Sequence, residues 1–297
     1  MIKNRSRAAY IFSMVIFGTI SIFKRGIALS SGEISLLRAV IGGSGILLYM
    51  LLRGEKLPFR QVKSQLPLLL LSGAMMGANW IFFFEAMNHT TVAVATLGYY
   101  FAPIIVMVLS PLLFREKFTA KQVLCFVMAS AGLVLIIGTG GGDGSSSYAM
   151  GIGFALAAAA LYAGVILLNK RITSVSGMNR TVFQFISAIA VLIPYVAMTS
   201  GFQVHTLSGS GIFCMLVLGL VHTGFAYCLY FSSLSTLQGQ QAAILSYTDP
   251  LVSVIVSVTI LGESLTLTQA IGGALILGFS LLNELELPKK SRTHAKK

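Results

Sequence analysis

The chain alternates long apolar runs with short polar segments. Each run approaches the roughly 20 residues that a helix needs to cross a bilayer core about 30 Å thick. The runs lie near residues 8–29, 33–52, 66–87, 91–114 and 120–138 in the first half and 149–169, 179–199, 210–231, 239–261 and 267–287 in the second. Hydropathy of this kind, with short loops throughout, predicts an all-α integral membrane protein with ten transmembrane helices.

The composition agrees with this prediction. Hydrophobic residues make up 56% of the 297 residues and charged residues only 10%, against about 25% charged residues in soluble domains. Ten spans leave no room for a soluble catalytic domain, so the chain is not expected to be an enzyme. The three cysteines imply no disulfide framework. No metal-ligand spacing is present either, and no cofactor is expected.

The net charge of +12 is concentrated in alternate loops. Lys24 and Arg25 fall in the opposite set of loops, and Arg38 lies inside a run. The positive-inside rule then places both termini in the cytoplasm of a bacterial-type cytoplasmic membrane. The expected partners are the lipid bilayer and a small-molecule solute rather than nucleic acid, with the protein acting as a monomer or a homodimer.

The two halves of the chain resemble each other. A shift of 147 residues places Tyr100 on Tyr247 and Pro103 on Pro250. The glycine-rich stretch 139–147 between the halves is typical of a linker. Two repeats, 1–144 and 145–297, would each contain an odd number of helices, so the second copy enters the membrane inverted. Such inverted-topology repeats, here forming one compact membrane unit, are typical of transporters that work by alternating access.

The same shift aligns two Thr-x-x-Gln sequences. They begin at Thr119 and Thr266, and each predicts a capping box at a helix start. Glu116 and Glu263 precede them, where a carboxylate should favour the N-terminus of the following helix through the helix dipole. These positions are expected to shape the fold rather than to bind solute.

Three segments identify the chain as similar to a known family. They are LLRAVIGGSGILLY, TLGYYFAPIIVMVLSPLLFREKFTAKQ and ILSYTDPLVSVIVSVTILGESLTLTQ. They resemble the EamA-type permeases of the drug/metabolite transporter superfamily, and the resemblance covers nearly the whole chain. It implies ten helices in two five-helix repeats around a central cavity. It also implies movement of small metabolites or drugs, with export favoured over uptake.

Asp249 is the outstanding polar residue within an apolar run. It lies halfway along the ninth run beside Pro250, which loosens a helix. The aligned position in the first half is Ala102, so the repeat architecture does not require an acid here. An intramembrane carboxylate is by default a functional candidate. We expect Asp249 to bind a solute cation or a proton; a neutral structural acid is the alternative.

Three further ionisable residues lie within the runs. His222 could exchange protons with Asp249, or it could serve as an interhelical hydrogen-bond partner. Arg38 and Glu85 are expected at similar depth, which favours a gating or structural salt bridge over direct contact with solute.

Aromatic residues occur at the same expected depth as Asp249. Rings around a carboxylate would bind an organic cation or a zwitterion with an apolar body; core packing is the alternative use. The candidates for solute binding are Trp80, Tyr99, Tyr100, Tyr227 and Tyr247, with Asn79 as a neutral hydrogen-bonding group and Pro103 and Pro250 as helix breaks.

The sequence thus predicts a secondary transporter for a small amphiphilic metabolite or drug-like solute, with proton coupling through Asp249 and His222 as one mechanism. A passive uniporter, or an importer of an organic cation or amino acid, is the alternative. A remote alternative is an intramembrane serine protease, because Gly42–Gly45 matches G-x-S-G and His222 could act as its base.

Overall fold

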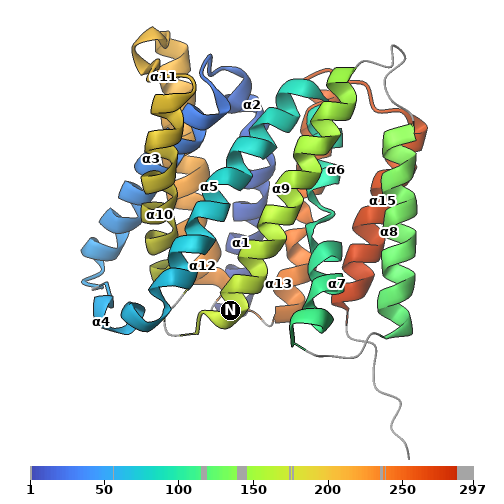
Figure 1. Cartoon of the computed structure of the whole chain (residues 1–297), viewed down its shortest axis with the longest axis horizontal. Helices are drawn as coiled ribbons and strands as arrows, with labels where there is room; N and C mark the ends of the chain where they lie inside the picture. Colours follow the sequence, from blue (N-terminus) through green and yellow to red (C-terminus); the bar gives the residue numbers. More distant parts are fainter. Residues whose placement is uncertain are drawn as a thin grey trace, which may run out of the picture.

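The computed structural model is a bundle of helices that run between two ends (Figure 1). It describes residues 2–55, 57–114, 119–138, 146–173, 175, 177–234, 237 and 239–285, and within these ranges no strand occurs. In this part of the chain, eight helices are long and apolar enough to cross a membrane, and Ile244–Thr259 and Leu267–Asn283 are shorter apolar helices. The all-α membrane fold is therefore confirmed.

Every predicted apolar run of the first half falls on helix. The elements are α1 (Ile2–Gly18), α2 (Ile20–Arg25), α3 (Ser31–Leu52), α4 (Phe59–Val62), η1 (Lys63–Gln65), α5 (Leu66–His89), α6 (Val92–Tyr99), α7 (Ala102–Phe114) and α8 (Ala120–Gly138).

The predicted apolar runs of the second half also fall mostly on helix. Its elements are α9 (Ser146–Arg171), α10 (Gly177–Met198), η2 (Val204–Thr206), α11 (Gly209–Leu216), the π-helix η3 (Val217–Phe225), α12 (Ala226–Leu234), α13 (Gly239–Ser246), α14 (Thr248–Thr259) and α15 (Leu267–Glu284). Helices α8 and α15 pack together at one edge of the bundle (Figure 1).

The first expected span breaks at Thr19, between α1 and α2. Two further spans break beside a proline, one between α6 and α7 and the other at Tyr247, between α13 and α14, and we call these the two helix breaks. Pro103 and Pro250 each lie in the first turn of the helix that follows the break. A proline is tolerated there because the N–H groups of a first turn have no intrahelical acceptor. The two breaks lie at aligned positions of the two halves.

Both capping boxes are present, as the sequence predicted. The Thr266 hydroxyl accepts a hydrogen bond from the backbone N–H of Gln269 at 3.2 Å. In return, the side-chain oxygen of Gln269 accepts one from the backbone N–H of Thr266 at 2.9 Å. Thr119 and Gln122 repeat the pattern at 3.2 and 2.8 Å. Glu116, most of the predicted linker and the boundary between the proposed repeats lie outside the described residues.

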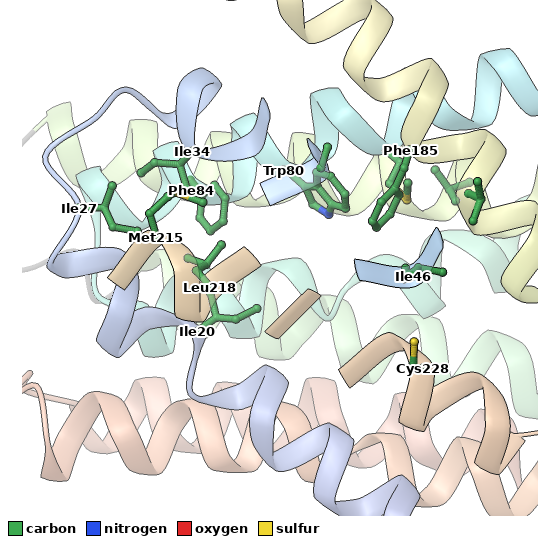
Figure 2. Packing of buried hydrophobic residues seen from close by; sticks show 14 of the residues in the cluster. Ile20, Ile27, Ile34, Ile46, Trp80, Phe84, Phe185, Met215, Leu218 and Cys228 are labelled. Carbon is green, nitrogen blue, oxygen red and sulfur yellow. The ribbon is translucent and has the colours of Figure 1, made fainter. Parts of the chain in front are cut away.

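The outer surface and the interior both suit a lipid solvent. Large apolar side chains such as Leu51 and Met198 are 72% and 85% exposed, an arrangement that water would penalise. The largest buried cluster joins α3, α5, α10 and η3, where Trp80 and Phe185 lie beside each other (Figure 2).

Candidate functional site

A cavity of about 670 Å³ lies beside the two helix breaks. That volume is within the range of about 300–1,000 Å³ of small-molecule sites. The cavity extends from Asp249 toward the end of the bundle where α9 ends and α10 begins. Lys170 and Arg180, at this end, belong to its lining, as does Tyr10 of α1. This is the end that carries the N-terminus in Figure 1.

The structure brings most of the predicted site residues to this cavity. Its lining includes Arg38, Asn79, Trp80, Tyr99, Tyr100, Pro103, Tyr227, Tyr247 and Asp249. Three of the predicted residues, Glu85, His222 and Pro250, are not among the described residues that line it.

Asp249 is held where α14 crosses α6. Its Oδ2 accepts a hydrogen bond from the Tyr100 hydroxyl at 2.8 Å. It lies in the first turn of α14, where the helix dipole favours a negative charge. Thr96 and Ser253 join α6 to α14 by a buried hydroxyl pair at 2.9 Å. Gly18 lets α1 approach closely, because an added Cβ there would lie 2.8 Å from the Asp249 carbonyl oxygen.

Aromatic rings form a continuous part of the cavity wall. Tyr99 stacks on Tyr162 with ring centroids 5.3 Å apart and contacts Phe83 at 4.6 Å. Tyr100 and Tyr247 lie 6.2 Å apart, one from each helix break. These rings offer an apolar surface to the body of a solute beside the carboxylate of Asp249.

Asn79 and Trp80 are already engaged by protein groups. The Asn79 side chain donates to the Ala158 carbonyl at 2.6 Å and so ties α5 to α9. Trp80 packs edge-on against Phe185 at 5.3 Å, and the Arg38 guanidinium lies over its ring at 4.7 Å. The cation expected over Trp80 is therefore supplied by the protein itself.

The expected Arg38–Glu85 salt bridge is wrong. Arg38 is 5% exposed and donates from Nε to the Thr223 hydroxyl at 2.8 Å. Glu85 accepts from the Asn88 side chain at 3.1 Å and lies 3.9 Å from His89. The directions of the side chains explain the error, because Arg38 bonds to η3 whereas Glu85 contacts residues of its own helix α5.

His222 occupies an interhelical position. Its Nε2 lies 3.0 Å from the Thr19 hydroxyl, and its Nδ1 lies 3.3 Å from the Val217 carbonyl oxygen. These contacts join η3 to the junction of α1 and α2, as in the hydrogen-bond alternative. Ser44 is exposed on α3, whereas His222 is buried with both ring nitrogens bonded elsewhere. The two residues therefore do not form the dyad that a serine protease requires.

Glu263 closes the opposite end of the bundle. Its carboxylate accepts the Val92 N–H at 2.7 Å and the Ser257 hydroxyl at 2.5 Å, and it forms an ion pair with Arg25. The carboxylate therefore caps α6 rather than the following helix α15, which corrects the sequence-based prediction. We call Arg25, Glu263 and Val92 the seal.

Several lining residues were not predicted. Tyr230 follows Tyr227 by three residues and therefore shares its helix face, so this spacing could have identified it. Lys170 and Arg180 were attributed to topology alone, although both line the cavity. Tyr10 and Tyr162 give no comparable signal in the sequence.

Comparisons with known proteins identify the family. The EamA-like transporter family model matches residues 8–138 and again residues 149–284. The chain is 29% identical over 278 residues to "Uncharacterized transporter YxxF" of Bacillus subtilis, covering 92% of this chain and 88% of that protein. It is also 29% identical over 276 residues to an "Uncharacterized transporter" of Archaeoglobus fulgidus, covering 93% and 94%.

A solved structure shares the fold of the chain. It has a TM-score of 0.65 and 21% sequence identity, and the match covers 94% of this chain and 97% of the other. Together with the multiple apolar helices, these matches describe a multi-pass membrane transporter. The chain therefore belongs to the EamA-like transporter family.

Proposed function

We propose that the protein is a secondary transporter that exports a small amphiphilic solute by alternating access. In this proposal, Asp249 binds the solute and a proton in turn. The observation that carries it is a cavity that holds a carboxylate beside a helix break. Its lining reaches Lys170 and Arg180 at one end of the described bundle, and the contacts of Glu263 with Arg25 and Val92 lie at the other end. A secondary transporter needs such a one-sided site, whereas a passive pore does not.

Alternating access rests on two inverted five-helix repeats, 1–144 and 145–297, with ten spans in total. Three features support this arrangement: the family model matches twice, the helix breaks lie at aligned positions, and each half has a capping box. An inverted repeat provides two states of similar energy, because each half can adopt the conformation of the other.

The basic loops indicate the orientation of the protein. With both termini in the cytoplasm, the cavity mouth at Lys170 and Arg180 faces inward and the seal faces outward. Opening toward the outside would break the contacts of Glu263 with Arg25 and Val92. A matching closure near the mouth would then enclose the solute site from the cytoplasm.

Asp249 gives a simple route to proton coupling. In the inward-open state, the carboxylate loses its proton to the cytoplasm and binds a cationic group of the solute. In the outward-open state, a proton from outside displaces that group, so the carboxylate does not remain as an uncompensated charge in the membrane. A proton gradient directed inward then drives the solute outward.

The experiment uses purified protein in proteoliposomes. A thermal-shift screen of amino acids, nucleosides and organic cations first identifies a solute that stabilises the folded state. Flux of that solute should saturate, show counterflow and respond to an imposed pH gradient. Asp249→Asn should abolish the response to the gradient, and Glu55→Gln, in an exposed loop, should retain it. Unchanged gradient-driven flux in Asp249→Asn would exclude Asp249 as the coupling site, and flux without saturation or counterflow would indicate a passive pore.

A further inference from the structure

We infer that Arg38 is a second solute-binding group of the cavity and that it binds an anionic group, so the solute is a zwitterion with a carboxylate and an amine. This inference rests on the proposed transport function and narrows its substrate class. It does not follow from the Asp249 site alone, which an organic cation would also satisfy.

Arg38 is fixed in place by η3. Its Nε donates to the Thr223 hydroxyl, which in turn donates to the Leu218 carbonyl at 3.0 Å. That carbonyl lies five residues before Thr223, within the π-helical stretch, a feature often found at functional sites. Gly42 allows α3 to pack this closely, because an added Cβ there would lie 2.3 Å from Thr223 Cγ2. The guanidinium is therefore preorganised.

The guanidinium keeps unused hydrogen-bonding capacity. Of its five N–H donors, the one on Nε bonds to Thr223. The guanidinium carbon Cζ lies over the Trp80 ring, 4.7 Å from its centroid. No described residue accepts a hydrogen bond from its two terminal nitrogens, and no described carboxylate forms an ion pair with it. A buried charge of this kind is costly unless it is paired. The planar fork matches a carboxylate in particular.

Asp249 presents the complementary charge to the same cavity. Its Oδ2 accepts from Tyr100, and no described residue donates to its Oδ1. Arg38 and Asp249 both belong to the lining of this cavity. A zwitterion bound between them would compensate both charges. An organic cation would leave Arg38 unpaired, and a simple carboxylate would leave Asp249 unpaired.

The rest of the lining agrees with this assignment. The aromatic residues Phe83 and Tyr99 belong to the same lining as the two charged groups and offer a surface for an apolar side chain. At the mouth, Lys170 and Arg180 add two positive charges. A positive entrance would attract a solute that carries a carboxylate and disfavour a purely cationic one.

The test measures binding of three matched probes to the purified full-length protein. Phenylalanine carries both charges, phenethylamine lacks the carboxylate, and 3-phenylpropionate lacks the amine. We expect phenylalanine to bind at least about 10-fold more tightly than phenethylamine, as expected for a hydrogen bond to a charged group. Arg38→Gln should reduce this ratio to about 1, and Arg38→Lys should retain part of it.

The control is Arg53→Gln, because Arg53 is an exposed arginine that also lies over a ring, that of Tyr49 at 5.3 Å, but outside the cavity. It should keep the ratio of the wild-type protein. Should Arg38→Gln fail to fold, Thr223→Val removes the acceptor of Arg38 and should lower the same ratio several-fold. Because the ratio compares two ligands on one protein, a general loss of stability does not change it.

Three results would overturn the inference: equal affinity of the wild-type protein for phenylalanine and phenethylamine, a ratio unchanged by Arg38→Gln in folded protein, or binding of none of the probes. Different results of the transport experiment would contradict the proposed function. Saturable counterflow of phenethylamine that depends on Asp249 but not on Arg38 would preserve the transporter and exclude the anion site. Loss of all counterflow by every solute that binds would contradict transport itself.

Discussion

The helices interrupted at the two helix breaks differ at one informative position. Both break beside an aligned tyrosine, Tyr100 or Tyr247, and both resume with a proline in the first turn. In the first copy, Ala102 also belongs to the cavity lining but is buried against α9 and carries no polar group. In the second copy, the aligned Asp249 faces the cavity and accepts a hydrogen bond from Tyr100. A break is thus present in both halves, whereas a carboxylate at this position is present only in the second.

The largest effect is expected when the second break is made to resemble the first. Asp249→Ala removes the group that compensates a cationic solute, so the half-saturating concentration in counterflow should rise about 10- to 100-fold. The change should also remove the response to a pH gradient. Ala102→Ser, the matched change in the first copy, should stay within about 3-fold. Equal effects of the two substitutions would show that the asymmetry has no functional meaning.

A smaller effect is expected from the hydrogen bond that links the two breaks. Tyr100→Phe removes the hydroxyl that donates to Asp249 while keeping the ring. Loss of one such bond should weaken solute binding about 3- to 10-fold. Titration of the purified protein measures this change, and Tyr195→Phe, on the exposed face of α10, serves as the control. An unchanged affinity would mean that Tyr100 does not orient the carboxylate.

The seal gives a test of the inverted relation between the copies. Glu263→Gln weakens the contacts with Arg25 and Val92, so the outward-open state should become more populated. A thiol placed at Ser253, which lines the cavity, should then react about 3- to 5-fold faster with an external reagent, as an ion pair worth up to about 1 kcal/mol predicts.

Glu116, the residue aligned with Glu263, provides the complementary variant. If the second copy is the inverted first copy, Glu116→Gln should slow external labelling at Ser253, because it should favour the inward-open state. The same direction of change in both variants would contradict the inverted repeat.

The smallest effect on transport is expected at the capping boxes. Thr119→Ala and Thr266→Ala should each lower the free energy of unfolding by about 1 kcal/mol, because each removes a side-chain acceptor at a helix start. Solute affinity should not change. Thermal unfolding in detergent measures the loss, and a change in affinity with either variant would mean that the boxes do more than begin helices.

Much of the fold could be predicted from the sequence because a helix in lipid must satisfy its own backbone hydrogen bonds. Apolar runs therefore mark helices, and Pro103 and Pro250 mark breaks, although Pro194 lies inside the unbroken helix α10. Asp249 and the tyrosines were recognisable for a related reason: polar groups within apolar runs are costly and so are informative.

The partners of the polar residues could not be predicted in the same way. Arg38 was assigned to Glu85 but bonds to Thr223, and Glu263 caps α6 instead of the next helix. Both contacts depend on how helices distant in sequence rotate against each other. The π-helical stretch of η3 adds to the difficulty, because it changes which side chains share a face around His222. Hydropathy contains no information on either feature.

The central claim is that solute and proton compete for Asp249, and proton release from the purified protein in weakly buffered detergent tests it most directly. Addition of a bound solute should release protons from the wild-type protein and from Glu55→Gln, but not from Asp249→Asn at solute concentrations that still saturate it. Release of the same size from Asp249→Asn, or binding to the wild-type protein without release at any pH tested, would contradict the claim.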